Sequence, residues 1–272
     1  MHNGALSPKD LDQDEAALVI SGLGFSYPDK SAVLQDIRLE VRSGERVALI
    51  GPNGAGKTTL FLLVCGVLKP EAGEISLFSE PVVPGQFRPE VGMIFQNPDD
   101  QLFCPSVEDD VAFGPLNLGL SKEEVEARVR DALSITGVPD LAARPPHHLS
   151  GGEKRLVSIA GVLAMRPRLV IYDEPTANMD LRYRRRLIRF LQGSEETMLI
   201  ASHDLEFILE VCNRVVLMDE GQVVANGKPP EVMGNVPLME AHGLERPHSL
   251  VPHRDPHHLD NTAKTQGRPD EP

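Results

Sequence analysis

The clearest chemical signal in the chain is a glycine-rich loop that ends in a lysine and a threonine, Gly51-Pro52-Asn53-Gly54-Ala55-Gly56-Lys57-Thr58. Glycine adopts backbone angles that a side chain would forbid, so such a loop can turn its N–H groups toward phosphate oxygens. The lysine offers a positive charge to the outer phosphates of a nucleotide, and the threonine hydroxyl is a ligand for Mg²⁺. We predict that residues 51–59, with Thr59 included, bind a nucleoside triphosphate; a chance glycine turn is the alternative.

Two carboxylates follow an apolar run further along the chain, Leu169-Val170-Ile171-Tyr172-Asp173-Glu174. A buried strand that ends in aspartate, downstream of a phosphate loop, is the usual Walker B arrangement, in which Asp173 would orient Mg²⁺ or its waters. Glu174 is then placed to act as a general base on an attacking water. Without the phosphate loop, a strand running into an acidic turn would be an equal interpretation.

A second segment offers phosphate-binding groups, Leu149-Ser150-Gly151-Gly152-Glu153. It combines a serine hydroxyl with glycine amides at a predicted helix N-terminus, where the backbone favours anions. As an isolated string it would be only a serine cap before a helix. Its position shortly before the predicted Walker B strand gives it more weight.

The elements needed to position these groups can be predicted from the hydrophobic pattern. Arg46–Ile50 is a β-branched apolar run before the loop, and residues 57–68 suit the helix after it, which is the context that the loop requires. Alternation of strands and helices implies a mainly parallel sheet with helices on both faces. The remaining predicted strands are 17–21, 34–41, 74–78, 91–95, 169–172, 198–201, 214–218 and 222–225, and the remaining helices are 121–134, 152–165, 182–191 and 205–212.

The chain divides into one folded domain and two polar ends. We predict a disordered N-terminus at residues 1–15, a domain at 16–244 with an inserted helical lobe at about 97–166, and a flexible tail at 245–272. The tail is rich in proline and charge, with little apolar content. Histidines gather near this end, and a solvated low-complexity tail is the preferred interpretation over a metal-handling one.

Composition restricts the functional classes. The 272 residues carry a formal net charge of −13, which disfavours a nucleic-acid binder because such binding neutralises phosphates. The basic run Arg182–Arg189 is interpreted as a solvated helix face rather than a nucleic-acid patch. Three scattered cysteines without a Cys-x-x-Cys pair fit a reducing compartment and argue against a disulfide scaffold or a zinc site.

Nothing in the sequence predicts a membrane span. Residues 1–17 are polar and acidic, unlike a signal peptide, and the longest apolar stretch, Leu156–Ile171, is interrupted by Arg166-Pro167-Arg168. A role at a membrane would therefore depend on a partner protein.

Together, the three motifs give the chain a resemblance to the ATP-binding-cassette family. Leu149-Ser-Gly-Gly-Glu153 is similar to the family's signature Leu-Ser-Gly-Gly-Gln, from which Glu153 is a departure, and the resemblance covers about residues 17–240. It implies the family's α/β nucleotide-binding domain: a P-loop fold whose mainly parallel sheet has an antiparallel β edge and an inserted helical lobe. It also implies ATP and Mg²⁺ as ligands, and Lys57, Glu174 and His203 as catalytic residues.

The resemblance implies three further site residues and a specific role for His203. Tyr27 stands where the family stacks an aromatic ring on adenine, although it could be a half-buried strand residue. Gln96 matches the glutamine that senses Mg²⁺ and links the ATP site to a partner. Asp180 matches the D-loop aspartate, with Asn178-Met179 in place of the commoner Gly-Leu. His203 matches the histidine that contacts the γ-phosphate; without that context it would be taken as structural.

Finer similarities point to the ATPase subunits of energy-coupling-factor importers. The stretches Phe95–Phe103 and Val107–Asn117 resemble the region that, in those subunits, holds a coupling helix of the transmembrane component. Carboxylates in this region would suit arginines on such a helix, with a solvated surface as the alternative: Asp99, Asp100, Glu108, Asp109 and Asp110. The stretches Arg144–Ser150 and Gly161–Met165 look most like the cobalt/nickel branch.

The implied function is an ATP-hydrolysing energy-coupling subunit of a membrane importer for cobalt or nickel ions, peripheral on the cytoplasmic face of the cell membrane. Two subunits, identical or paralogous, would sandwich each ATP between Gly51–Thr59 of one and Ser150–Gly152 of the other. The further partners are a transmembrane coupling component and a substrate-binding membrane component, with no nucleic acid. The alternatives are coupling to vitamin import, a soluble ATPase not tied to transport, and a non-hydrolysing nucleotide binder, which the intact Asp173-Glu174 pair disfavours.

Overall fold

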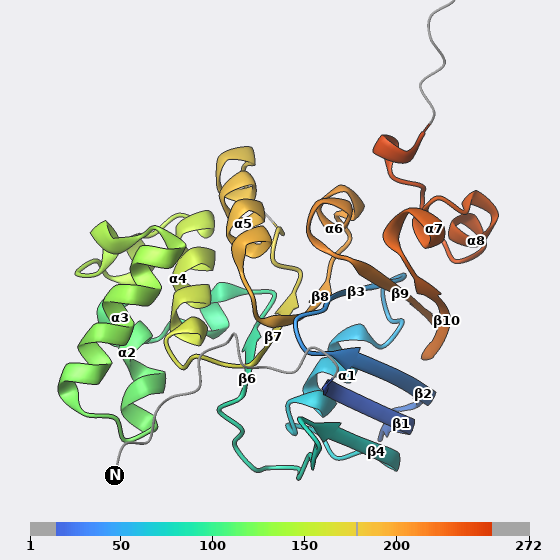
Figure 1. Ribbon diagram of the computed structural model, residues 1–272, viewed down its shortest axis with the longest axis horizontal. Coiled ribbons are helices and arrows are strands. Elements are labelled where there is room, and N and C mark those ends of the chain that lie inside the picture. Colours follow the sequence, from blue (N-terminus) through green and yellow to red (C-terminus); the bar gives the residue numbers. More distant parts are fainter. Residues whose placement is uncertain (1–14, 178, 252–272) are drawn as a thin grey trace, which may run out of the picture.

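The computed structural model describes residues 15–177 and 179–251, which form two β-sheets with helices around them (Figure 1). A four-stranded antiparallel sheet has the order β2-β1-β4-β5, and a six-stranded sheet has the order β10-β9-β3-β8-β7-β6. The first consists of β1 (Ala16–Tyr27), β2 (Lys30–Arg42), β4 (Ala72–Leu77) and β5 (Glu80–Pro81). The second consists of β3 (Arg46–Ile50), β6 (Val91–Ile94), β7 (Leu169–Asp173), β8 (Thr197–Ala201), β9 (Arg214–Asp219) and β10 (Gln222–Gly227).

The predicted architecture is confirmed, with one refinement. Strands β9, β3, β8, β7 and β6 run parallel, while β10 pairs antiparallel with β9 at one edge. The other antiparallel strands form a sheet of their own instead of extending the parallel one. Every residue of β7 and β8 is buried, as expected for parallel strands that are covered on both faces.

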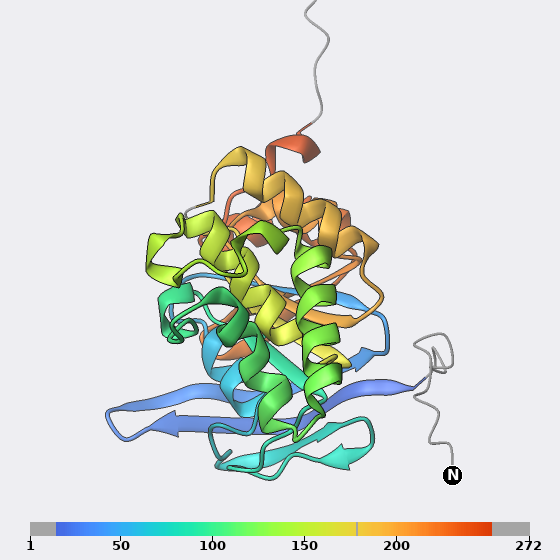
Figure 2. The ribbon, with the colours of Figure 1, turned by 90° about the vertical axis from the view of Figure 1, so that its left-hand side faces the viewer.

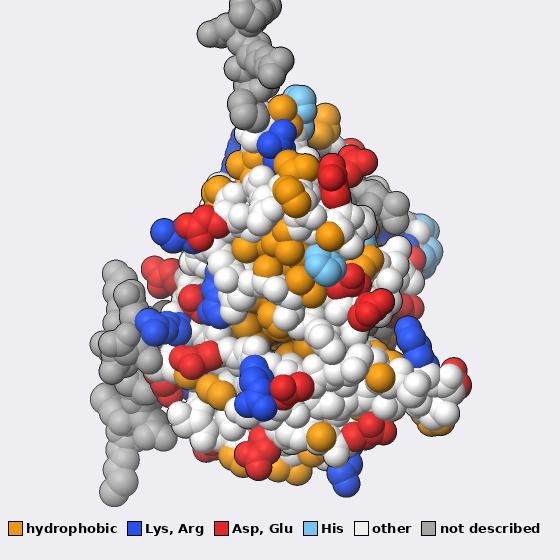
Figure 3. Space-filling model, turned by 90° about the vertical axis from the view of Figure 1, so that its right-hand side faces the viewer, with side chains coloured by type: hydrophobic (Ala, Val, Ile, Leu, Met, Phe, Trp, Pro, Cys, Tyr) orange, Lys and Arg blue, Asp and Glu red, His pale blue; other side chains and the backbone are white. Residues whose placement is uncertain are grey.

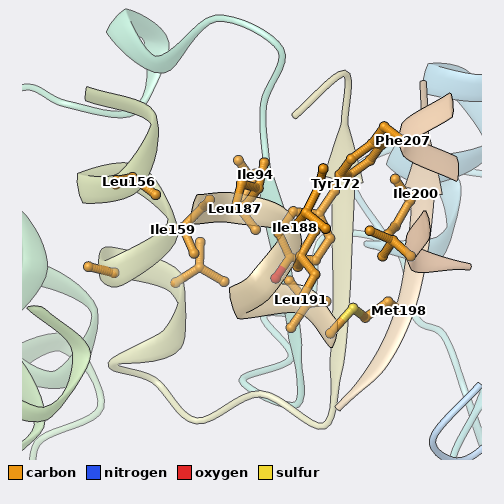
Figure 4. Close-up of a cluster of buried hydrophobic side chains, with 14 of the residues drawn as sticks. Ile94, Leu156, Ile159, Tyr172, Leu187, Ile188, Leu191, Met198, Ile200 and Phe207 are labelled. Atoms are coloured by element: carbon orange, nitrogen blue, oxygen red, sulfur yellow. The ribbon is translucent and has the colours of Figure 1, made fainter. Parts of the chain in front are cut away.

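Successive residues of the parallel strands point into two different cores. In β7, Leu169 and Ile171 face a core that contains α1 (Lys57–Val64) and the inner face of the antiparallel sheet. Val170 and Tyr172 belong to the opposite core. The close-up in Figure 4 shows Tyr172 in that core together with Ile188 of α5 (Leu181–Gly193) and Phe207 of α6 (Leu205–Val211). Side chains alternate between the two faces of a strand, so the parallel sheet is apolar on both faces. Helix α1 covers the face toward the antiparallel sheet, and the remaining helices cover the other face.

The inserted lobe consists of α2 (Val107–Asn117), α3 (Lys122–Thr136) and α4 (Gly151–Leu163), which stand together over one side of the molecule in Figure 2. Helix α3 begins near the predicted position and is capped by Ser121, whose side chain accepts a hydrogen bond from the N–H of Glu124. Helix α2 was not predicted as a separate element. Its signal was the same kind of cap, since Ser106 accepts from the N–H of Asp109 and acidic residues fill the first turn.

Element ends differ from the predictions where glycine or tertiary packing decides them. Helix α1 ends at Val64 instead of residue 68, and the chain turns at Gly66, whose φ is 70°. Two short helices near the end, α7 (Pro229–Met233) and α8 (Val236–Ala241), were not predicted. Their few apolar residues, including Met233 and Met239, become fully buried only through contacts with the sheet core.

The two predicted polar ends lie mostly outside the described residues. Residues 1–14 and 252–272 are not described, so their predicted disorder stays a prediction. Residues 245–251 of the predicted tail are described, and His248–Leu250 forms a 3₁₀ turn. Ser249 hydrogen-bonds the carboxylate of Glu206 in α6 through its N–H, at 3.0 Å, and its hydroxyl, at 2.5 Å. This first part of the tail is therefore attached to the domain.

Candidate nucleotide-binding site

The sheet order brings three separate motifs to one edge. In the parallel sheet β8 lies between β3 and β7, with Ala201 beside both Leu49 and Asp173. The glycine loop follows β3, the carboxylate pair ends β7, and His203 follows β8. Because the carboxyl ends of parallel strands open at the same edge, residues far apart in the chain meet in one crevice.

The glycine loop is shaped by positions that no side chain could occupy. At Gly51 the φ angle is 147°, and a Cβ atom would lie 1.9 Å from the carbonyl oxygen of Met218. At Gly56, the N-terminal cap of α1, φ is 98° and a Cβ would lie 2.6 Å from Cδ2 of Leu34. The loop therefore curls at the N-terminus of α1, where N–H groups are free to bind an anion.

Lys57 lies inside this curl. Its Nζ donates hydrogen bonds to the carbonyl oxygens of Gly51, at 2.7 Å, and Pro52, at 3.0 Å. Burial lowers the pKa of Lys57, and the negative charges of Glu174 and Asp173 oppose that shift. The ammonium group is thus held within the loop, partly desolvated and facing two carboxylates.

Thr58 and Asp173 form a pair of oxygen ligands. The Thr58 hydroxyl donates to Oδ2 of Asp173 at 2.8 Å. Asp173 is buried, and burial raises its pKa, while the hydrogen bond from Thr58 and the charge of Lys57 oppose the rise. A hydroxyl and a carboxylate at a phosphate loop are the oxygen donors that Mg²⁺ prefers, so the residues present fit that ion.

Glu174 is held in a strained and poorly solvated position. Its φ of 49° is unusual for a residue with a side chain. Oε2 accepts a hydrogen bond from the backbone N–H of His203 at 3.1 Å, whereas Oε1 has no hydrogen-bond partner in the described part of the chain. Burial raises the pKa of this carboxyl group, and the backbone hydrogen bond and the His203 ring oppose the rise. An unpaired buried oxygen of this kind fits a group that receives a proton from water.

His203 connects the loop to the carboxylate pair. Its Nε2 lies 2.9 Å from Oδ1 of Asn53 and 3.5 Å from Oε1 of Glu174. The ring is half-exposed, so it remains accessible from the pocket. Among the predicted catalytic residues, Lys57, Glu174 and His203 therefore share one site.

These groups line a pocket of about 200 Å³ together with residues from the antiparallel sheet. Tyr27 lies at one side, with its hydroxyl 3.3 Å from Oγ1 of Thr59 and its ring edge-on to Phe25. Gln96 also lines the pocket, and so do Lys30 and Val33, which were not among the predicted site residues. The full lining is Tyr27, Lys30, Val33, Asn53, Gly54, Ala55, Gly56, Lys57, Thr58, Thr59, Gln96, Asp173, Glu174 and His203.

The other predicted site residues do not line this pocket: Gly51, Pro52, Ser150, Gly151, Gly152 and Asp180. Gly51 and Pro52 still belong to the loop, where their carbonyl groups accept from Lys57. The Ser150 hydroxyl accepts a hydrogen bond from the N–H of Glu153 at 3.3 Å, and the Glu153 carboxylate accepts one from the Ser150 N–H at 2.8 Å. This reciprocal cap starts helix α4. Nothing lies within 4 Å of a Cβ placed on Gly151, so the start of α4 is open to solvent.

Gly152 and Asp180 belong to the junction of α4 with α5. A Cβ on Gly152 would lie 2.6 Å from the ring of Tyr183. Asp180 caps α5, because its Oδ1 accepts a hydrogen bond from the Tyr183 N–H at 2.9 Å. The signature segment and the D-loop aspartate are therefore neighbours of each other and not of the phosphate loop within this chain.

Two surface interpretations need revision. Asp110, assigned to an acidic surface cluster, is buried, and its Oδ1 accepts hydrogen bonds from the N–H groups of Phe103 and Cys104. The basic run on α5 is also only partly a solvated face. Arg184 pairs with Asp204 at 2.6 Å and Arg185 pairs with Glu210 at 2.6 Å.

Known proteins resemble this chain in sequence. Residues 34–177 match the ABC transporter family. A putative ABC transporter ATP-binding protein of Synechocystis is 54% identical over 234 residues, covering 86% of this chain and 82% of that protein. The energy-coupling factor transporter ATP-binding protein EcfA of Methanothermobacter thermautotrophicus is 47% identical over 233 residues, covering 83% of this chain and 75% of that protein.

Two solved structures are similar in fold. The structure of cbiO1 from Clostridium perfringens, described as part of the ABC transporter complex cbiONQ, superposes with a TM-score of 0.75 at 36% identity, covering 84% of this chain and 94% of that one. A bacterial Atm1-family ABC exporter with ATP bound gives a TM-score of 0.71 at 23% identity, over 82% of this chain and 41% of that one. The second likeness concerns the fold alone.

The fold and the site therefore define an ATP-binding-cassette nucleotide-binding domain. The chain belongs to the ABC transporter family and is an ATPase of the kind whose hydrolysis is coupled to transport. No helix within the described residues is long and apolar enough to cross a membrane.

Proposed function

We propose that this chain is the ATP-hydrolysing, energy-coupling subunit of an energy-coupling-factor importer, and that it works as a pair. The observation that carries the proposal is the separation of the two phosphate-binding segments. The pocket is lined from one side by residues 53–59, 173–174 and 203, while Ser150 and Gly151 lie outside it and are exposed. A second subunit packed head to tail would supply its own Ser150–Gly152 segment to this pocket.

Within that site each side chain has a distinct role. Lys57 and the loop N–H groups bind the phosphates, and Tyr27 packs against the adenine. Thr58, Asp173 and Gln96 would hold Mg²⁺, which when bound would neutralise charge on the phosphates. Glu174 takes the proton of the attacking water, and His203 positions the outer phosphate from its place between Asn53 and Glu174.

A surface beside Gln96 suits the transmembrane coupling component. Aromatic rings are exposed here: Phe103 and Phe113 meet edge-on with centroids 4.9 Å apart, and their exposed fractions are 65% and 48%. Acidic residues border them at Asp100, Glu108 and Asp109. We infer that an amphipathic helix with apolar and arginine side chains binds here, since apolar contact would supply area and carboxylate–guanidinium pairs would supply orientation.

Cobalt or nickel is the proposed transported ion. The support is the similarity to cbiO1, a protein whose description places it in the cbiONQ transporter complex, together with the stretches Arg144–Ser150 and Gly161–Met165. The ion itself would be recognised by a separate substrate-binding membrane component, with this chain peripheral on the cytoplasmic face. Coupling to a vitamin importer and a soluble ATPase not tied to transport are the competing outcomes.

Three measurements test the proposal. Light scattering of Glu174→Gln with ATP and Mg²⁺ should show a monomer becoming a dimer, and a persistent monomer would overturn the paired site. The tagged chain, co-expressed with its genomic neighbours, should co-purify from detergent-solubilised membranes with integral membrane proteins. Radioactive cobalt and nickel uptake by those cells then distinguishes ion import from vitamin import, and the absence of any membrane partner would favour the soluble ATPase.

A further inference from the structure

A buried arginine of the signature helix holds the backbone beside the nucleotide pocket. Arg155, on α4, is 2% exposed and is among the largest fully buried side chains of the described residues. Its Nη1 donates a hydrogen bond to the carbonyl oxygen of Phe95, and its Nη2 donates one to that of Gln96. One guanidinium group thus joins the helix that begins at Ser150 to two consecutive residues of the loop after β6.

Gln96 depends on this contact for its position. Its side chain lines the pocket but makes no hydrogen bond with any other residue that the structure describes. Its location is therefore set by its backbone. Burying a guanidinium group is costly unless its donors are satisfied. The two carbonyl groups accept from Nη1 and Nη2, whereas Nε has no hydrogen-bond partner among the described residues.

A second contact fixes the rest of the loop to the same helix. Lys154, next to Arg155, pairs with Asp99 at 2.6 Å. On the other side, Gln101 closes the loop through its Oε1, which accepts from the Phe95 N–H at 3.1 Å. The segment 95–101 is thus held between the end of β6 and the first turns of α4, and it has little freedom to move apart from that helix.

We propose that Arg155 is a positioning residue for Gln96, so that the start of α4 and the pocket glutamine move as one unit. The inference rests on the proposed role of Gln96 at the nucleotide. The inference also predicts the route by which the signature segment and the pocket are coupled. A change at Ser150–Gly152, where the second subunit would bind, reaches the first subunit's own pocket through Arg155 rather than through the sheet.

Arginine is required because both planar N–H groups are used. Lysine at this position keeps the positive charge, which faces Asp173 and Glu174, but its single ammonium group does not reproduce the fork that spans two carbonyls. Arg155→Lys therefore changes the geometry of the loop while preserving the charge near the pocket. This makes it the informative substitution.

The test is a double-mutant cycle on the turnover number and on ATP affinity in the assembled transporter. Gln96→Ala and Arg155→Lys should each lower kcat by about tenfold or more, because an ångström-scale misplacement of a reacting group can cost about 10²-fold. The double variant should fall no further than about twofold below Gln96→Ala, since groups acting through one another are not additive. The dissociation constant for ATP should stay within about twofold throughout, as expected for misplacement without loss of binding.

Arg128 provides the matched control. Its Nη1 also donates to two carbonyl oxygens, those of Ala164 and Met165, but beyond the far end of the same helix. Arg128→Lys should lower the unfolding temperature while leaving kcat unchanged, and its effects should add to those of Gln96→Ala. Additive effects of Arg155→Lys and Gln96→Ala would overturn the positioning role alone. An unchanged kcat in Gln96→Ala would overturn both that role and the proposed function of Gln96.

A fluorescence measurement gives a readout that does not depend on turnover. The chain contains no tryptophan, so Phe95→Trp places a single reporter on the loop. ATP with Mg²⁺ should change its emission when Arg155 is present, and Arg155→Lys or, if that variant does not fold, Arg155→Gln should abolish or reduce the change. An identical response in the Arg155 variants would contradict the inference.

Discussion

The phosphate loop and the signature segment offer the same chemical groups to a nucleotide, yet they stand in opposite environments. Around the loop, Lys57, Asp173 and Glu174 are buried and their pKa values are shifted. Hydrogen bonds connect the three strand ends, from Thr58 to Asp173 and from the His203 N–H to Glu174. Ser150 and Gly151 are exposed, and the hydroxyl of Ser150 is occupied only by the cap of its own helix. The groups around the phosphate loop contact one another within the chain, whereas Ser150 and Gly151 lie exposed at the surface.

That contrast fits the proposed pairing, in which each chain would supply half of a site. Buried charges require partners that the fold must supply, so the catalytic side chains are fixed where the strands end. An exposed helix N-terminus needs no partner beyond water and a cap. It therefore remains free to bind an anion that a second subunit would present. The predictions below separate effects on the buried region from effects on the exposed one.

The largest expected effect is at Glu174. Glu174→Gln keeps the size and the acceptor for the His203 N–H but removes the base, so kcat should fall by about 10²–10⁴-fold. Binding of ATP should be retained, and isothermal titration with ATP and Mg²⁺ checks this directly. Turnover close to that of the unchanged protein would remove Glu174 from its proposed role.

Two adjacent glycines distinguish packing within the chain from contact between chains. Gly151→Ala meets nothing within 4 Å, so stability should be unchanged, but its methyl group would face the nucleotide of the second subunit. ATP-dependent dimerisation and hydrolysis should fall about tenfold or more, by the logic of a misplaced reactant. Gly152→Ala places its methyl group against Tyr183, so unfolding should become easier by about 1–3 kcal/mol.

Thermal unfolding measures the stability of the two glycine variants, and light scattering separately measures their ATP-dependent dimerisation. Full hydrolysis by Gly151→Ala, measured in the dimeric state, would contradict the exposed segment's role in a shared site. Unchanged unfolding of Gly152→Ala would mean that the Tyr183 ring moves aside without cost.

The pH dependence should have opposite signs for activity and for stability. Burial raises the pKa of Glu174, and only the deprotonated group can act as a base, so hydrolysis should fall as pH drops through a value above the ordinary glutamate range. A carboxyl group with a raised folded-state pKa binds more protons when folded, so its contribution to stability increases as pH falls through that value. Glu174→Gln lacks this contribution.

Denaturant titrations of the unchanged protein and of Glu174→Gln at several pH values isolate the contribution of Glu174 to the unfolding free energy. Near neutral pH the Glu174→Gln variant should be the more stable protein, and the difference should shrink toward acid pH. A difference that widens toward acid pH would mean that the folded state stabilises the Glu174 carboxylate instead of disfavouring it.

The smallest expected effect concerns a helix cap. Ser150→Ala should lower the unfolding free energy by about 1 kcal/mol, because the hydroxyl accepts from the Glu153 N–H. Ser121→Ala should cost a similar amount at the start of α3, where the same bond joins Ser121 to Glu124. Only Ser150→Ala should also weaken ATP-dependent association, measured by light scattering, and equal association of both variants would assign Ser150 to capping alone.

Local chemistry made much of the pocket predictable. The glycine loop, the carboxylates at the end of an apolar run and the serine caps depend on residues close together in the sequence, where backbone angles and hydrogen-bonding groups decide the structure. The same reasoning identified nine of the ten strands at least in part and five of the eight helices. Helix α2, with its internal Pro115, and the short α7 and α8 carry weak local signals.

What the sequence by itself determined is therefore the set of reacting groups and the class of fold. Tertiary structure decided which residues meet. Arg155 donates to the backbone of Phe95 and Gln96, Asp110 is buried, and Ser150 lies outside the pocket. Each of these outcomes depends on how the helical lobe packs against the sheet. The contacts of these particular polar residues arise from that packing, and the order of neighbouring residues does not specify them.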